Sequence, residues 1–77
     1  MLDRTFSGDT KVADFNAQFN ADFEVSEPDE TLAELMVRTL GHHPEEGESI
    51  YIEPYEISVK ESSLLEIKTI SIKTRVI

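Results

Sequence analysis

The stretch TLAELMVRTLGHHPEEG, residues 31–47, decides the fold, because it contains a helix start, an amphipathic run and a helix stop. Thr31 and Glu34 have the spacing of a capping box, in which the hydroxyl accepts the Glu34 N–H and the carboxylate accepts the Thr31 N–H. Asp29 is the alternative N-cap. Gly41 predicts the end of the helix, since glycine adopts a positive φ without steric cost. One apolar face follows from the helical spacing of Leu32, Leu35, Met36 and Leu40.

The residues before this stretch predict a short strand and a first helix. The strand is expected at residues 2–6 and is followed by a turn at residues 7–9. Asp9 or Thr10 is the expected N-cap of the first helix, since both residue types can accept a backbone N–H there. One face of that helix carries Val12, Phe15 and Phe19.

The residues after the stretch predict a first strand with one buried face. Ile50 and Ile52 alternate with Tyr51 and Glu53, which is the period of a half-buried strand. Pro54 interrupts the pattern and predicts a bend or a sheet edge, because proline has no N–H to donate to a neighbouring strand.

A hairpin follows, and its second strand contains a change of register. Ile57 and Val59 indicate a strand, and the serines at 62–63 predict a tight turn after it. In the last strand the apolar positions change parity, from Leu65 and Ile67 to Ile70 and Ile72. Because a slip of one residue would turn the apolar set to solvent, we expect a β-bulge near residues 68–69.

Together these elements predict a single α+β domain over residues 1–77. Two helices pack on one face of a small, mostly antiparallel sheet, made of the N-terminal strand and a three-strand meander with a bulge. A chain of 77 residues buries only about 60% of its unfolded surface. It therefore has little core to spare for a deep active-site cavity.

Composition excludes several classes of function. There is no cysteine, which removes disulfides, thiolate zinc sites and cysteine nucleophiles. No apolar run approaches the roughly 20 residues of a membrane span, and no secretion signal is recognisable at the N-terminus. The formal net charge is -9. Because nucleic-acid binding depends on Lys and Arg displacing counterions, we do not expect DNA, RNA or anionic lipid as direct partners.

The chain resembles a known family in the order and spacing of several residues. The pattern consists of Gly8, Thr31, Leu32, Leu40, Gly41, Pro44, Gly47 and Glu48, followed by the β-rich tail. It resembles the CorC/HlyC family, the transporter-associated domain, from about Phe6 to Val76. Two positions depart from it: Glu34 stands where the family usually has a small residue, and His43 where it usually has an aliphatic one.

The resemblance implies an accessory role in ion transport. Domains of this family are cytosolic C-terminal parts of hemolysin-like membrane proteins related to magnesium and cobalt efflux, and also end some cation/proton antiporters. They usually follow a transmembrane region and a CBS pair, which are the implied partners. The chain would then be cut from a larger protein at the cytoplasmic face of the inner membrane, and be soluble when isolated.

The turn after the second helix contains a candidate metal site. His42 and His43 lie among Glu45, Glu46 and Glu48, and imidazole with carboxylate can bind a divalent transition metal. Adjacent histidines in a turn rarely point both rings at one ion, however. The alternative is that these are solvated turn residues, or that the His43 ring covers the core.

The connector at residues 22–30 contains a second candidate. Phe23 and Val25 are expected to contact the core, while the acidic side chains could form a weak oxygen-ligand site for Mg²⁺ or Ca²⁺. The spacing of a dedicated calcium loop is missing. The acidic residues of the connector are Asp22, Glu24, Glu27, Asp29 and Glu30. Their alternative role is a solvated surface.

Enzymatic chemistry is not indicated. Glu53 and Glu56 could be called an acid and a base, but nothing in the sequence places them in a cleft. No serine lies in a nucleophile-elbow pattern and no glycine-rich loop could hold a phosphate, so we expect neither catalytic residues nor a cofactor.

Contact with a partner remains as a function. Tyr51 and Tyr55 flank Pro54 and are expected opposite the buried isoleucines, where aromatic side chains often anchor an interface. The alternative is that they cover the edge of the sheet. The tail at residues 64–77, with Ile70 and Ile72, could pair edge to edge in a homodimer.

Two hypotheses follow. The first is a non-catalytic regulatory domain of an ion transporter that acts by domain docking or dimer contacts. The alternative is a module that senses a small ligand or a divalent cation through its acidic surface.

Overall fold

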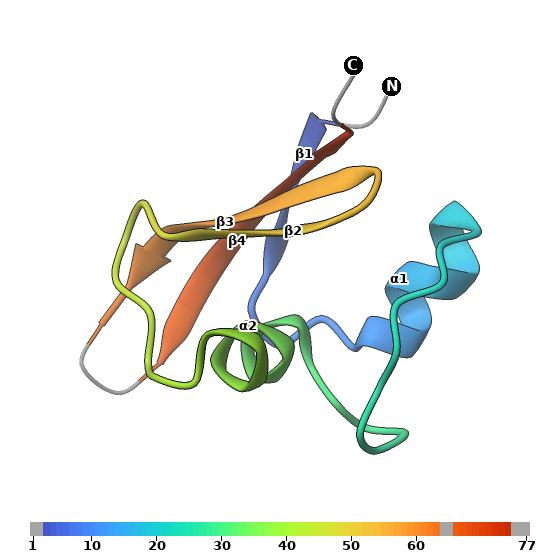
Figure 1. Ribbon diagram of the computed structural model, residues 1–77, viewed down its shortest axis with the longest axis horizontal. Coiled ribbons are helices and arrows are strands. Elements are labelled where there is room, and N and C mark those ends of the chain that lie inside the picture. The colour runs from blue at the N-terminus through green and yellow to red at the C-terminus, as the bar shows by residue number, and fades with distance from the viewer. Residues whose placement is uncertain (1–2, 64–65, 75–77) are drawn as a thin grey trace.

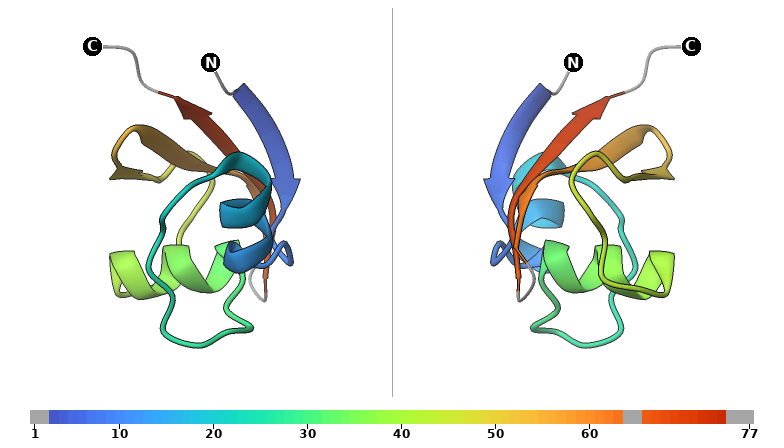
Figure 2. Two further views of the ribbon diagram at one scale, coloured as in Figure 1. Left: turned by 90° about the vertical axis from the view of Figure 1, so that its right-hand side faces the viewer. Right: turned by 90° about the vertical axis from the view of Figure 1, so that its left-hand side faces the viewer.

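A four-stranded sheet and two helices form two layers in the computed structural model (Figure 1), which describes residues 3–63 and 66–74. The expected α+β fold is confirmed. The elements are β1 Asp3–Ser7, α1 Val12–Phe19, α2 Leu32–Leu40, β2 Ser49–Ile52, β3 Tyr55–Ser62 and β4 Ile67–Thr74. Both helices lie on the same side of the sheet, which curves around them (Figure 2).

The sheet has the order β1-β4-β3-β2, and each neighbouring pair is antiparallel. The strands β2, β3 and β4 form the predicted meander, and β1 adds to the other side of β4. The prediction that the tail offers a free edge is therefore wrong for β4, because β1 pairs along it from Asp3 with Lys73 to Ser7 with Thr69. Leu64, Leu65 and residues 75–77 lie outside the described residues.

The register between β3 and β4 changes twice. Val59 pairs with Ile70, but Glu61 pairs with Thr69, so Lys60 is an extra residue in β3. Ser62 then pairs with Ile67, which leaves the residue between Ile67 and Thr69 as the extra one in β4. The irregularity in β4 confirms the predicted change of parity, and the one in β3 was not predicted.

The start and end of α2 are confirmed. Thr31 and Glu34 form the capping box, and Gly41 ends the helix at φ 81°. Asp29 is not the cap; its carboxylate lies 3.6 Å from the Lys11 ammonium.

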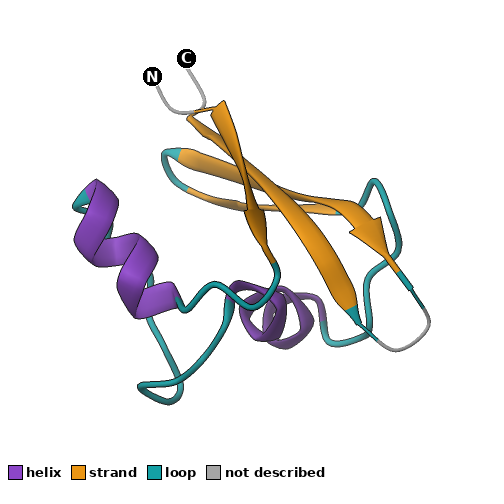
Figure 3. Cartoon of the chain, turned by 180° about the vertical axis from the view of Figure 1, so that it is seen from behind, coloured by secondary structure: helices purple, strands orange, loops and turns teal. Residues whose placement is uncertain are grey.

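The start of α1 differs from its prediction. The N-cap is Lys11, which makes no side-chain cap, rather than Asp9 or Thr10. Backbone of the connector replaces the missing cap, because Val12 N donates to Glu30 O at 2.9 Å. The two segments that precede the helices run together there (Figure 3), and Leu32 N in turn donates to Thr10 O. Pairing between distant segments therefore sets the start of this helix.

The core lies between the sheet and the helices. Phe15 contacts the rings of Phe19 and Phe23, with centroid distances of 4.9 and 5.2 Å. Phe23 is buried as predicted, but Val25 is 40% exposed, so it does not reach the core. The buried apolar residues are Val12, Phe15, Phe23, Leu32, Leu35, Met36, Ile50, Ile57, Val59, Ile67, Ile70 and Ile72.

Candidate functional site

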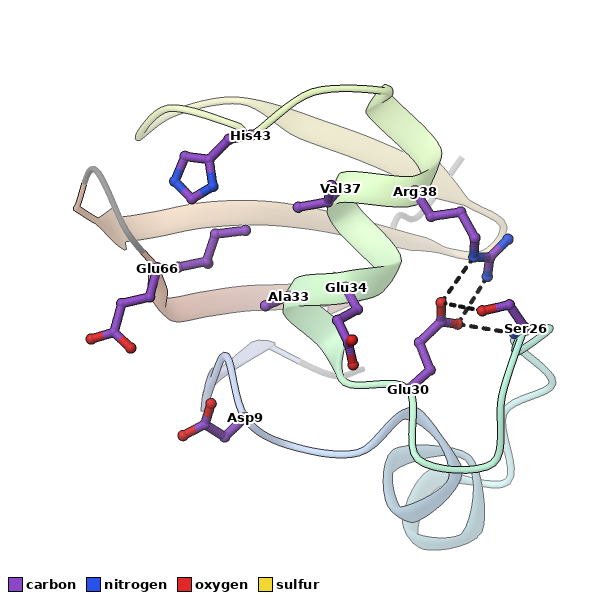
Figure 4. Close-up of a pocket in the computed structure, with 10 residues that line it drawn as sticks. Asp9, Ser26, Glu30, Ala33, Glu34, Val37, Arg38, His43 and Glu66 are labelled. Carbon is purple, nitrogen blue, oxygen red and sulfur yellow. Dashed lines mark hydrogen bonds and ion pairs between the residues drawn. The ribbon is translucent and has the colours of Figure 1, made fainter.

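A shallow groove of about 480 Å³ runs beside α2 (Figure 4). The helix supplies Ala33, Glu34, Val37 and Arg38, and four other parts of the chain supply the rest. The remaining lining residues are Asp9, Ser26, Glu30, His43, Glu66 and Ile67. The groove therefore exists only after the β1–α1 loop, the connector and the start of β4 have been brought to α2.

The middle of the groove is apolar. Ala33 and Val37 are one helical turn apart and point to the same side of α2 (Figure 4), and Ile67 lines the same groove. Val37 is 38% exposed, which makes it one of three large hydrophobic residues that reach solvent among the described residues. The helix thus presents a small apolar strip to the groove, in which Ala33 packs against the core and Val37 reaches solvent.

One end of the groove is closed by an ion pair whose carboxylate is buried and whose arginine is partly exposed. Arg38 Nε donates to Glu30 Oε2 at 2.9 Å and Arg38 Nη2 to Glu30 Oε1 at 3.0 Å, while the Glu30 side chain is only 4% exposed. Ser26 donates to the same carboxylate through Oγ and N. Arg38 and Ser26 together lower the pKa of Glu30 despite its burial, and the carboxylate raises the pKa of Arg38. The pair ties the connector to α2.

The other charged groups around the groove are acidic. Within residues 3–63 and 66–74, Asp9, Glu34 and Glu66 form no ion pair. The Glu34 carboxylate accepts hydrogen bonds from Thr31 N and Oγ1, and these leave its charge without a cation. The rim therefore has three carboxylates with no compensating charge.

The two histidines of the turn do not point at a common ligand. His42 Nε2 lies 3.0 Å from Glu48 Oε1, whereas His43 Nε2 lies 3.0 Å from the Ser63 carbonyl oxygen. Glu45 N donates to Glu48 Oε2 at 2.6 Å, and this bond, with His42, lowers the pKa of Glu48. The turn is thus held by two local hydrogen bonds to Glu48 and by one from His43 to the distant Ser63. A second groove beside it is lined by His43, Pro44, Glu45, Glu46, Ser62 and Ser63.

The acidic connector is arranged differently from the proposed cation site. Glu30 forms its ion pair with Arg38, and Asp29 forms an exposed ion pair with Lys11. In the described part of the chain, no three His, Asp or Glu side chains are grouped so that they could hold a metal ion. Of the two acids considered for acid–base chemistry, Glu53 is exposed and Glu56 lies 4.0 Å from the Lys73 ammonium.

The four residues proposed for partner contacts fall into three environments. Tyr51 is 56% exposed on the edge strand β2. Tyr55 is half-buried and meets Phe15 and Phe23 edge-to-face, with centroid distances of 5.8 and 5.4 Å, so it belongs to the inner face. Ile70 and Ile72 have no exposed surface, and the prediction that they contact a partner is wrong for this fold. The inner strand β4 places both in the core.

The groove itself was not predicted from the sequence. The signal that could have indicated it is the pair Ala33 and Val37, two apolar residues at i and i+4 that lie off the buried stripe of α2. The acids on its rim are far apart in the sequence, so no local pattern could bring them together.

Neither described helix is long and apolar enough to cross a membrane.

Comparisons with known proteins agree with this architecture. A region associated with a proposed Mg²⁺ and Co²⁺ transporter (CorC) of Neisseria meningitidis MC58 is 27% identical, with a TM-score of 0.84 over 96% of this chain and 89% of that chain. A CorC_HlyC domain from Haemophilus ducreyi has a TM-score of 0.85 at 18% identity, over 99% and 100% of the two chains.

A third similar structure is that of a transporter-associated CorC_HlyC domain from a Xylella fastidiosa Temecula1 hemolysin in complex with Mg²⁺ and Mn²⁺. It is 15% identical, with a TM-score of 0.82 over 96% of this chain and 89% of that chain. No curated protein matches the chain. The model of the transporter-associated domain, CorC_HlyC, matches residues 3–76. The chain belongs to the CorC_HlyC family of transporter-associated domains.

Proposed function

We propose that this domain is a non-catalytic regulatory part of an ion transporter and that it acts by docking onto another part of the same protein. The observation that carries the proposal is the groove along α2, with exposed Val37 in its apolar middle. A shallow surface with an apolar centre and a charged rim is typical of a protein interface. It suits a protein segment better than a small substrate, which needs a deeper cavity.

The mechanism would be a shift between transporter states. A domain that binds one state more tightly than another favours that state by the difference in binding free energy. The expected docking partners are the CBS pair or the transmembrane region, at the cytoplasmic face of the inner membrane. Tyr51 on the edge strand β2 offers a second contact, to a partner domain or to another copy in a homodimer.

The test compares two exposed valines in the parent transporter. Val37 lies in the groove and Val25 outside it, and their exposed fractions are 38% and 40%. We expect Val37→Gln, like deletion of residues 3–76, to change the regulation of ion flux, and Val25→Gln to leave it unchanged. Flux is measured in vesicles over a range of ion concentrations. Unchanged flux and regulation after the deletion would reject the proposal.

The alternative function, sensing of a divalent cation, is favoured by one observation on a similar protein, the structure of the Xylella fastidiosa domain in complex with Mg²⁺ and Mn²⁺. Its test here is a thermal melt of the 77-residue chain with Mg²⁺, Mn²⁺, Co²⁺ or Zn²⁺. A ligand that binds only the folded state raises its stability with concentration. A melt that does not respond to millimolar cation would remove this alternative.

A further inference from the structure

We propose that the groove on α2 binds a basic amphipathic helix, that is, a protein segment with apolar side chains on one face and Lys or Arg beside them. The inference rests on the proposed docking function and names the chemistry of the docked segment. It is carried by the charge of the rim, the spacing of the apolar residues and the geometry of the helix that presents them.

The rim selects for positive charge. The only guanidinium that the structure places in the groove, that of Arg38, is already bidentate with Glu30, so Asp9, Glu34 and Glu66 remain uncompensated. The whole chain is also acidic, with a net charge of -9. Opposite charge steers a partner to such a surface and like charge rejects one. Acidic segments, nucleic acid and anionic lipid are therefore disfavoured.

The apolar middle of the groove favours a partner whose apolar side chains have a helical spacing. Ala33 and Val37 are four residues apart on α2, which separates them by about 6 Å along the helix axis. A docked helix that presents apolar residues at i and i+4 matches this spacing. An extended peptide is less suited, since it would bind by backbone hydrogen bonds, and the backbone of α2 is already bonded within its own helix.

A divalent cation is a poorer occupant of the same carboxylates. The described residues contain no group of three acidic or histidine side chains close enough to hold a metal ion. Asp9, Glu34 and Glu66 come from the β1–α1 loop, α2 and the residue before β4, and in Figure 4 they lie apart along the rim. Separate charges of this kind suit several ammonium or guanidinium groups on one segment.

The experiment is an NMR titration of the ¹⁵N-labelled 77-residue chain with a synthetic 18-residue peptide. The peptide is a helix of Leu, Ala and Lys, with Leu on one face and Lys on both flanks. Two further peptides serve as controls, one of the same composition with the Leu residues scattered around the helix and one with Glu in place of Lys. We expect saturable shifts at the amides of Asp9, Ala33, Val37 and Ile67 with the first peptide alone, weakening as salt is added.

Matched variants assign the binding to the groove. Asp9→Lys with Glu66→Lys should weaken it about tenfold, whereas Asp22→Lys with Glu53→Lys, the same charge change at exposed positions outside the groove, should weaken it less than about threefold. Val37→Arg should abolish binding and Val25→Arg should not. A thermal melt of each variant confirms that it is folded.

Several outcomes would overturn the inference. They are the absence of shifts at millimolar peptide, equal binding of the acidic peptide, and shifts that map to β2 instead of α2. Shifts at the same amides with Mg²⁺ alone, saturating below 1 mM, would make the rim a cation site. Shifts that depend on protein concentration and vanish in Val37→Arg would make the occupant a second copy of this chain.

The result is separable from that of the proposed function. Peptide binding is measured on the isolated chain, and regulation is measured in the parent. If the peptide binds at the groove while Val37→Gln leaves flux unchanged, the chemistry of the groove stands and the regulatory role fails. If Val37→Gln alters regulation but only the acidic or scattered peptide binds, docking stands and the inferred basic helix fails.

Discussion

Gly8 and Ile67 approach each other so closely that a Cβ atom on Gly8 would overlap the carbonyl oxygen of Ile67. Both backbone polar groups of Gly8 form hydrogen bonds. Its N–H donates to Lys68 O at 2.9 Å, and its carbonyl oxygen accepts from Ala33 N at 3.1 Å. The end of β1, the start of β4 and the first turn of α2 therefore meet at one residue without a side chain. This junction also places Asp9, Ala33 and Ile67 around the groove.

Substitution of Gly8 by alanine is expected to destabilise the fold by about 3 kcal/mol, since overpacking against backbone cannot be relieved by a side-chain rotation. Gly41→Ala is the matched control. A Cβ there would meet nothing within 4 Å, and only the φ of +81° penalises it, at about 1 kcal/mol. Urea unfolding of both variants checks the order. A smaller loss for Gly8→Ala than for Gly41→Ala would contradict the proposed contact.

The Glu30–Arg38 pair gives a second prediction. Glu30→Gln removes the charge from the buried carboxylate of a bidentate pair, and we expect a loss of about 1 to 3 kcal/mol in the free energy of unfolding. The same change at exposed Glu27 should alter it by less than about 0.5 kcal/mol. Both are measured by urea unfolding. Equal losses at the two positions would mean that the pair does not stabilise the connector.

The Glu30 carboxylate also predicts how the stability of the fold decreases at low pH. Folding lowers the pKa of Glu30 from its ordinary value of 4.5, because Arg38 and Ser26 bond to the ionised form. The folded state thus binds its proton less readily than the unfolded state, so the stabilisation is complete above pH 4.5 and is lost as the pH falls below it. Glu30→Gln should flatten the fall in melting temperature over this range. An unchanged slope would exclude Glu30 as a source of it.

The capping box of α2 can be separated from the rival cap by two substitutions. Thr31 Oγ1 accepts Glu34 N at 3.2 Å, and Thr31 N donates to Glu34 Oε1 at 2.9 Å. Thr31→Ala should therefore cost about 1 kcal/mol. Asp29→Ala removes only an exposed contact at 3.6 Å to Lys11 and should change stability by less than about 0.5 kcal/mol. A larger loss in Asp29→Ala would reverse the assignment of the cap.

The features that could be predicted from residues 31–47 are those that depend on interactions between near neighbours in the sequence. The capping box, the buried stripe and the stop at Gly41 all depend on groups within a few residues of each other, so their spacing in the sequence is already their spacing in space. The alternation in β2 and β3 is local for the same reason. The parity change in the last strand predicted an irregularity that lies at the described start of β4.

The candidate site depended on contacts between segments that are distant in the sequence. Backbone pairing between the β1–α1 loop and the connector started α1 at Val12 in place of a side-chain cap. The position of β1 beside β4 removed the expected free edge, and packing of the core against the sheet buried Ile70 and Ile72.

The sequence by itself therefore determined which segments are helix and strand, which face of each is apolar, and an acidic surface without cysteine chemistry. Only the tertiary structure decided that Glu30 pairs with Arg38 and that Asp9, Glu66 and Val37 surround one groove. The physical reason is the sequence separation over which each kind of interaction acts. Hydrophobic period and capping act over one or two turns of chain, whereas the partner of a carboxylate is set by whichever segment the packed core brings beside it.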